Sequence, residues 1–146
     1  MSPMEKPHAR ATGKLDRWFQ RSLGDEFSVR VQLPLTLRDS EPEPDLAIVR
    51  EADAAAARRH PKTALLVVEV ADTSVRYDLE VKARIYARAR IPEFWLVVVR
   101  NRVVEVLREP DSKKGAYRSR VTVPATGTLE PAAFPGLKQP VRSLFD

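Results

Sequence analysis

The sequence predicts an α/β domain in which a mixed β-sheet is flanked by α-helices. Two observations carry this prediction. Short apolar strands come both before and after one helical segment, Asp72–Arg90, and this chain order is typical of a sheet with helices packed on it. The 146 residues, 43% of them hydrophobic and 31% charged, suffice for one globular domain, 1–146, with its own core.

The N-terminal part of the chain is predicted to contain an arm, a helix and a strand. Residues 1–10 are polar and contain two prolines, which predicts an arm without regular structure. Apolar residues recur at helical spacing over Ala11–Leu23, and Gly24 is a suitable end for this helix. The alternating segment Phe27–Leu37 predicts one half-buried strand, in which Pro34 favours a sheet edge or a bulge.

The central part of the chain is predicted to hold two strands and a loop. Asp45 opens the first short strand, and the Ala- and Arg-rich segment Glu51–Lys62 is expected to be a mobile loop. The second strand, Leu65–Val70, is apolar except for Glu69. In the helix that follows, Ser74 can serve as the N-cap, and Pro92 prevents the helix from continuing.

The C-terminal part of the chain is predicted to be mostly β-structure. Two apolar strands joined through Arg100–Asn101–Arg102 favour a hairpin, and Gly115–Val123 indicates one more strand. The proline-rich tail from Pro124 to Asp146 is expected to wrap the surface.

The composition excludes several classes of protein. No cysteine is present, which excludes disulfides and thiolate chemistry, and the apolar runs are too short to span a bilayer. No secretory signal is recognisable, so we expect a cytoplasmic protein without a membrane partner. The net charge of +5 permits nucleic-acid binding, although the basic residues are spread along the chain.

Glu69 is the most informative residue of the sequence. An unpaired ion in a core costs at least several kcal/mol, so a carboxylate inside an apolar strand needs a compensating partner. Asp45 begins the preceding strand, and the two carboxylates can converge at one end of the sheet if these strands are neighbours. Two carboxylates repel each other unless a cation lies between them.

The chemistry of these residues points to a divalent metal. Oxygen ligands without cysteine or paired histidine suit Mg²⁺ or Mn²⁺, and such an ion can activate water against a phosphodiester. Lys82 on the following helix can neutralise charge that develops on the phosphate. His8 and His60 have no metal-ligand partner at a useful spacing, and nothing indicates an organic cofactor.

Simpler explanations exist for each residue. Asp45 could cap the start of a strand, and Asp78 with Lys82 could be a solvated pair four residues apart on a helix. Glu69 could pair with Lys82 alone, without any metal.

Three segments carry a resemblance to a known family: EPEPDLAIV, LLVVEVADTSVRYDLEVKARIYARARIPEFWLVVV and RVVEVLREP. From about His8 to the C-terminal tail, the chain resembles the Uma2 family (DUF820). That family belongs to the PD-(D/E)XK, or restriction-endonuclease-like, superfamily. The resemblance implies a mixed sheet flanked by helices and a nuclease-type site for a divalent metal.

The resemblance also implies roles for individual residues. Asp45 matches the aspartate of the Pro-Asp element, and Glu69 matches the acidic residue of the next strand, so both are expected to be metal ligands and catalytic. Ala71 stands where the superfamily pattern has a lysine, and that role passes to Lys82. Asp78 is a possible second-shell partner, and Gln32 resembles a glutamine that borders the site.

Two departures from the family pattern concern the framework of the site. The N-terminus is shorter than usual for the family, which could trim the sheet or a wall of the substrate groove. Arg90 stands where a helix-ending glycine is expected, so either a left-handed cap at this residue is strained or the helix must end otherwise.

The expected function is therefore a divalent-metal-dependent endonuclease that hydrolyses phosphodiester bonds, with DNA as the expected substrate. The alternative is a catalytically inactive nucleic-acid-binding or interaction protein on the same fold. The sequence leaves the oligomeric state open, and a homodimer is one option for reaching both strands of a duplex.

Overall fold

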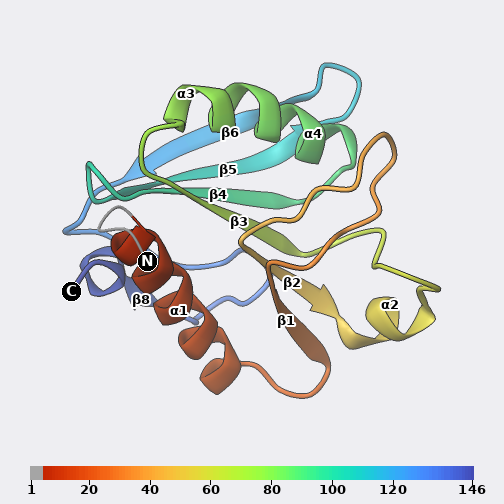
Figure 1. The fold of residues 1–146 in the computed structure, drawn as a ribbon, viewed down its shortest axis with the longest axis horizontal. Helices are drawn as coiled ribbons and strands as arrows, with labels where there is room; N and C mark the ends of the chain where they lie inside the picture. Colours follow the sequence, from red (N-terminus) through yellow and green to blue (C-terminus); the bar gives the residue numbers. More distant parts are fainter. Residues whose placement is uncertain (1–4) are drawn as a thin grey trace.

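Six strands form one mixed sheet in the order β1–β2–β3–β4–β5–β6 in the computed structural model, which describes residues 5–146 (Figure 1). These strands are β1 (Phe27–Val31), β2 (Leu46–Arg50), β3 (Leu66–Ala71), β4 (Glu93–Val98), β5 (Val103–Asp111) and β6 (Ala116–Val123). Strands β3 and β4 are parallel, whereas the other neighbouring pairs are antiparallel. The predicted mixed α/β fold and the predicted β4–β5 hairpin are both confirmed.

Helices cover both faces of this sheet (Figure 1). The remaining elements are α1 (Glu5–Ser22), α2 (Glu51–Ala56), α3 (Val75–Tyr77), the π-helix η1 (Asp78–Lys82), α4 (Ala83–Arg88), β7 (Thr128–Leu129), β8 (Gln139–Pro140) and the 3₁₀-helix η2 (Val141–Leu144). Helix α1 and the C-terminal tail pack on one face, and the α3–η1–α4 segment, which connects β3 to β4, packs on the other. Within the described residues, no helix is long and apolar enough to cross a membrane.

Each face of the sheet has its own apolar core. Trp18 and Phe19 of α1 pack against Trp95 in the first core, with ring centroids 6.4 and 6.2 Å from the Trp95 ring. Tyr86 of α4 packs against Phe94 in the second core, at a centroid distance of 5.2 Å. Because strand residues alternate between faces, neighbouring residues of β3 and β4 serve different cores.

The prediction of one strand over Phe27–Leu37 is wrong beyond Val31. Gln32 has a positive φ of 51°, which breaks the extended backbone and its period-two alternation. As a result, Val31 packs on the first core, whereas Leu35 and Leu37 are buried in the second. The apolar pattern is real, but its two halves serve opposite faces of the sheet.

Two segments predicted to lack regular structure are helical. The predicted arm over residues 1–10 is wrong from Glu5 onward, where α1 begins; the part before Glu5 lies outside the described residues. A proline in the first turn is compatible with this helix, because the first N–H groups need no intrahelical acceptor. The predicted loop Glu51–Lys62 begins with helix α2, whose four alanines and acidic first turn favour a helix.

The C-terminal tail contributes to the core as well as to the surface. Leu129, Val141 and Leu144 are buried in the first core, although this segment was predicted only to wrap the surface. The buried Glu93 anchors the tail by accepting a hydrogen bond of 2.8 Å from the backbone N–H of Ala132. Short irregular segments with isolated apolar residues give no periodic signal, so the sequence did not indicate this packing.

Candidate functional site

Asp45 and Glu69 lie at the same end of neighbouring strands. Leu46 of β2 pairs with Val68 of β3 in antiparallel register, so the residue before Leu46 and the residue after Val68 reach the same point of the sheet. The Asp45 carboxylate reaches across to β3, where Oδ2 accepts a hydrogen bond of 2.7 Å from the backbone N–H of Val70. The predicted convergence of the two carboxylates is present.

Glu69 points into the second core, toward η1 and α4. Its side chain has the same strand alternation as Val67 and Ala71, which belong to that core, and only 6% of the residue is exposed. Glu69 Oε2 accepts a hydrogen bond of 2.6 Å from the Tyr86 hydroxyl and one of 3.1 Å from Lys82 Nζ. The buried charge therefore has two donors, both from the helical segment after β3.

A π-helical turn presents Lys82 to Glu69. The backbone N–H of Ala83 donates to the carbonyl of Asp78, five residues earlier, so η1 is one wide turn between α3 and α4. The prediction of a regular capped helix is wrong in this stretch, and Ser74 makes no side-chain bond to the helix backbone. Its hydroxyl donates instead to Asp78 Oδ2 at 2.7 Å, one helical turn later, where the Asp78 N–H donates to the Ser74 carbonyl.

Burial and the neighbouring charges shift the pKa values of Glu69 and Lys82. Burial raises the pKa of the Glu69 carboxyl, and the nearby Asp45 charge adds to this rise, while the Tyr86 and Lys82 donors oppose it. Burial alone would lower the pKa of Lys82, but the Glu69, Asp78 and Asp45 carboxylates together outweigh burial and raise it. Lys82 is therefore a stable cation, and Asp78 supports its charge from nearby.

His8 is a member of the site that sequence reasoning missed. Its Nε2 lies 3.4 Å from Asp45 Oδ2, and 31% of its side chain is exposed. The sequence predicts a loose arm at this residue, so its contact with Asp45, just before β2, could not be foreseen. The signal was helical spacing: counting back from Leu15 by seven residues reaches His8, on the sheet-facing side of α1.

Gln32 borders the site through its backbone. Its N–H donates to the carbonyl of Asp45 at 3.1 Å, and its side chain is exposed. The kink at Gln32 thus fixes the chain beside Asp45, whereas a role for the Gln32 side chain stays a prediction.

Arg90 forms the cap that holds Tyr86 in place. Arg90 has a φ of 60°, and its N–H donates to the carbonyl of Ala87, while Ile91 N–H donates to the carbonyl of Tyr86. These two bonds are those of a Schellman motif, in which glycine usually occupies the left-handed position. Of the two helix endings that the sequence left open at Arg90, the structure has the left-handed cap.

The oxygens left over at the site can accept a cation. Asp45 Oδ2 and Glu69 Oε2 take all the hydrogen bonds of these two carboxylates, so Asp45 Oδ1 and Glu69 Oε1 have no donor among the described residues. No cluster of three or more acidic, histidine or cysteine ligands occurs among those residues. Two carboxylate oxygens supplemented by water and phosphate oxygens match the way proteins bind Mg²⁺.

The other buried glutamates show what a purely structural carboxylate looks like here. Glu93 accepts from Trp95 and Arg108 on one oxygen and from Ala132 on the other. Glu105 uses both oxygens with the Thr122 hydroxyl and pairs with Arg120. Both glutamates use both carboxylate oxygens, which distinguishes them from Glu69.

Comparisons with known proteins agree with this architecture. Residues 1–142 match the model of the Uma2 family, described as "Putative restriction endonuclease". A crystal structure described as a putative nuclease belonging to DUF820, from Anabaena variabilis, superposes with a TM-score of 0.70 at 12% identity, covering 95% of this chain and 80% of that one. The similarity in structure concerns the fold alone.

Two further comparisons add little. The type IIG restriction endonuclease BpuSI aligns over 77% of this chain and 12% of its own, at 18% identity and a TM-score of 0.49, which is too low to support an argument. The comparison with curated proteins found no match.

Proposed function

This chain belongs to the Uma2 family, and on that premise we propose that it is a divalent-metal-dependent endonuclease that hydrolyses phosphodiester bonds in DNA. The observation that carries the proposal is the pairing of Asp45 and Glu69 at one end of the sheet, each with one oxygen that accepts no hydrogen bond from the residues that the structure describes. Lys82 supplies a fixed positive charge beside them, 3.1 Å from Glu69.

Asp45 Oδ1 and Glu69 Oε1 are the atoms proposed to hold Mg²⁺ or Mn²⁺. The donor set fits these ions, because both ligands are hard carboxylate oxygens and neither a thiolate nor a second imidazole competes. When bound, such an ion polarises a phosphoryl oxygen and lowers the pKa of a water molecule.

The protein's own groups hold the site in shape for attack by water. Val70 N–H and His8 fix the Asp45 carboxylate from one side, while Tyr86 and Lys82 fix Glu69 from the other. Lys82 keeps its proton, so we assign it to neutralising the negative charge that grows on the phosphate oxygens. Water attacks phosphorus directly, and no covalent intermediate with the protein is required.

Cleavage of supercoiled plasmid DNA with Mg²⁺ or Mn²⁺ tests this function. We expect the wild type to cut and Glu69→Gln and Lys82→Ala to lose at least about 100-fold in rate. Glu105→Gln is the matched control. Like Glu69, Glu105 is 6% exposed and pairs with a basic residue, here Arg120, but it lies on β5, away from Asp45. Equal rates for wild type, Glu69→Gln and Lys82→Ala would overturn the assignment.

One observation favours a second function, an inactive nucleic-acid-binding or interaction protein on the same fold. Lys82 and Tyr86 already compensate the Glu69 charge without a metal. In that case Glu69→Leu would raise stability, since well-packed apolar groups often replace buried ion pairs without loss. Salt-dependent DNA binding without cleavage would then be the expected behaviour of the wild type.

A further inference from the structure

Three arginines line one hollow at the end of the sheet that carries the candidate site. Arg10 comes from α1, and Arg100 and Arg102 come from the turn between β4 and β5. The hollow has a volume of about 370 Å³, and its other lining residues are Pro7, Val99 and Phe145. Apolar walls and three guanidinium groups suit an anionic ligand with a flat or extended body.

No side chain that the structure describes neutralises the positive charge of the hollow. Arg10, Arg100 and Arg102 are exposed, and none forms an ion pair with any side chain that the structure describes. Asp146 directly follows Phe145, yet it too makes no ion pair with these arginines. Three like charges gathered without a counter-charge repel one another, which is a cost that a bound anion removes.

The hollow and the candidate site share the same end of β3 and β4. Glu69 pairs with Leu96 in parallel register, and Val99 lies three residues further along, where its N–H donates to the carbonyl of Ala71. Strand geometry places Val99 about 11 Å from Glu69, which is roughly three steps of a nucleic-acid strand. On the opposite wall, Pro7 lines the hollow and the next residue, His8, contacts Asp45.

Arg102 occupies a backbone position that costs an arginine energy. Its φ is 53°, in the left-handed region, and its N–H closes the turn by donating to the carbonyl of Val99. Glycine or asparagine would adopt this conformation with less strain. The strain at Arg102 supports a role for its side chain, since strained backbone positions cluster at functional sites.

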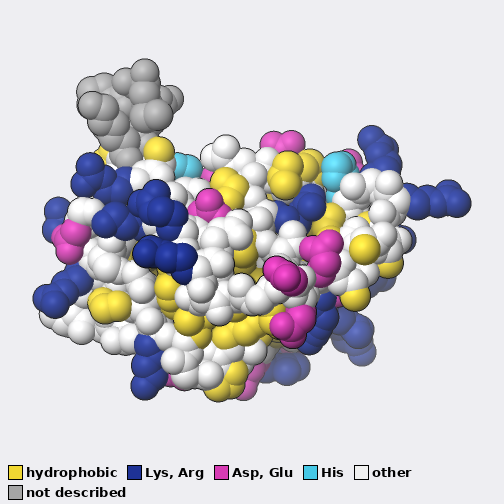
Figure 2. All heavy atoms as spheres, turned by 90° about the horizontal axis from the view of Figure 1, so that it is seen from below, with side chains coloured by type: hydrophobic (Ala, Val, Ile, Leu, Met, Phe, Trp, Pro, Cys, Tyr) yellow, Lys and Arg dark blue, Asp and Glu magenta, His cyan; other side chains and the backbone are white. Residues whose placement is uncertain are grey.

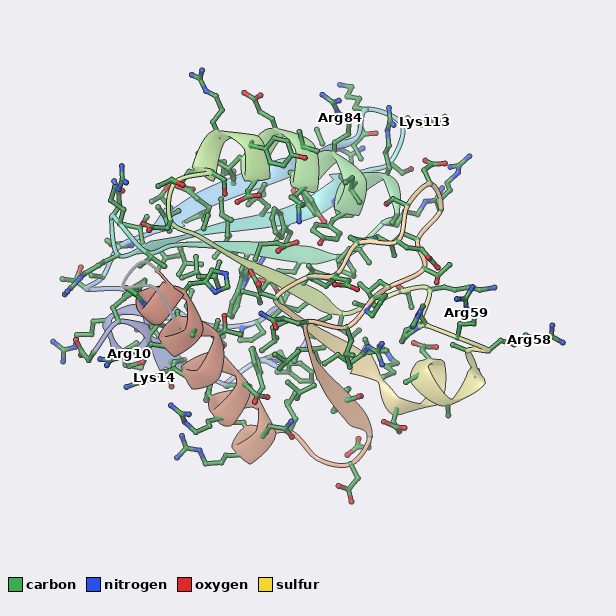
Figure 3. The ribbon with its side chains drawn as sticks, viewed as in Figure 1. Arg10, Lys14, Arg58, Arg59, Arg84 and Lys113 are labelled. Carbon is green, nitrogen blue, oxygen red and sulfur yellow. The ribbon has the colours of Figure 1, made fainter. Side chains whose placement is uncertain are left out.

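A row of basic residues on α1 continues from the hollow. Arg10, Lys14, Arg17 and Arg21 follow the spacing of one helix face, away from the face that carries Leu15 and Phe19. Lys and Arg side chains gather on the left of the face seen in Figure 2, the side on which α1 lies. Figure 3 shows Arg10 and Lys14 pointing outward from α1, with Arg58 and Arg59 at the opposite end of the molecule.

We propose that the hollow of Arg10, Arg100 and Arg102 binds a backbone phosphate of the DNA strand about three nucleotides from the bond that is cut, and that the basic row of α1 guides the same strand. This proposal rests on the proposed function, since it concerns the path of the same substrate. A polymer fits better than a small free anion, because the row extends the positive charge over about 16 Å of helix.

Binding of a fluorescein-labelled DNA duplex, followed by anisotropy in EDTA between about 50 and 200 mM salt, tests the proposal without cleavage. We expect the double variant Arg100→Ala/Arg102→Ala to bind about tenfold more weakly and to lower the salt slope by about 1.8, for two lost phosphate contacts. Arg58→Ala/Arg59→Ala removes the same charge at the far end and should bind as the wild type does.

The outcomes distinguish a failure of DNA binding at the hollow from a failure of the nuclease function. Equal losses in both double variants would mean that diffuse charge binds DNA, and no loss in either would mean that DNA avoids the hollow; each overturns the proposal. If wild type binds through the hollow but never cuts with Mg²⁺ or Mn²⁺, the nuclease function fails while the hollow stands. If wild type cuts DNA with Mg²⁺ or Mn²⁺ but does not bind it in EDTA, the hollow fails while the nuclease function stands.

Arg102→Gly guards against an effect of misfolding. Glycine relieves the left-handed strain, so the unfolding midpoint should rise while DNA affinity falls. A variant that is more stable and binds DNA as tightly as the wild type would exclude the Arg102 side chain from the phosphate site.

Discussion

The Tyr86 hydroxyl donates a hydrogen bond of 2.6 Å to Glu69 Oε2, the same oxygen that Lys82 contacts at 3.1 Å. Both donors thus contact the same oxygen, and Glu69 Oε1 has no donor among the described residues. Tyr86 is fully buried, and its backbone carbonyl accepts the closing bond of the helix cap from Ile91. Tyr86 therefore links the end of α4 to the carboxylate that we propose as a metal ligand.

Removing this hydroxyl should weaken the fold measurably. We expect Tyr86→Phe to cost about 1.5–3 kcal/mol in free energy of unfolding, because its acceptor is a carboxylate. The loss of the donor also raises the pKa of Glu69 further. Urea unfolding measures the first effect. Tyr117→Phe is the control: its hydroxyl donates to the neutral carbonyl of Ile91, and about 1 kcal/mol should be lost. Equal losses would contradict a charged acceptor.

The raised pKa of Glu69 makes stability depend on pH. The folded state holds the Glu69 proton more tightly than the unfolded state, whose carboxyl keeps its ordinary pKa of 4.5. The stabilising effect of that proton is complete below pH 4.5 and is lost as pH rises through the folded-state pKa.

Glu69→Gln should therefore gain stability relative to the wild type as the pH rises from 4.5 toward neutral, since glutamine has no proton to lose. Urea unfolding of both proteins at several pH values, without metal, measures the difference. The raised pKa would be contradicted if the free energy of unfolding of Glu69→Gln, minus that of the wild type, stayed constant or fell as the pH rises.

Relief of the strained helix cap should stabilise the protein. Arg90 has a φ of 60°, so Arg90→Gly is expected to add up to about 1 kcal/mol to the free energy of unfolding. Arg88→Gly, two residues earlier and at the last position of α4, should instead lower the free energy of unfolding by up to about 1 kcal/mol. Thermal unfolding of the two variants checks both signs. A loss of stability in Arg90→Gly would mean that the Arg90 side chain makes a compensating contact.

His8 should influence metal binding through Asp45. The His8 ring lies 3.4 Å from Asp45 Oδ2, and loss of such an orienting partner commonly lowers metal affinity about 10–100-fold. His8→Ala should therefore weaken Mn²⁺ binding in a calorimetric titration. The chain has one other histidine, His60, and His60→Ala should leave the affinity unchanged. Unchanged affinity in His8→Ala would remove His8 from the site.

Regular apolar periodicity made most of the fold predictable. The strand with Glu69, the hairpin and the helix faces with Leu15 and Ala83 all repeat their pattern over several residues. The kink at Gln32 was not predictable, because a single positive φ leaves the alternation of residue types intact while it moves the chain to the other face. The tail was missed because its buried residues have no period.

The residues of the candidate site were predictable where their side chains are unusual for their surroundings, and they were not predictable where they look like ordinary core or surface residues. A carboxylate in an apolar strand drew attention to Glu69, and Asp45 and Lys82 followed from strand order and resemblance. Tyr86 on an apolar helix face looked like core, which it also is. His8 depended on a long-range contact between α1 and the start of β2, which no local pattern encodes.

A crystal soaked in Mn²⁺ provides the most direct test of the central claim, that Asp45 and Glu69 together hold a divalent cation. Anomalous diffraction at the manganese edge should show one peak within about 2.5 Å of oxygens of both carboxylates, the ordinary range for such ligands. The same peak should be absent in Glu69→Gln and present in Glu105→Gln. A fully soaked crystal with no peak between Asp45 and Glu69 would contradict the account.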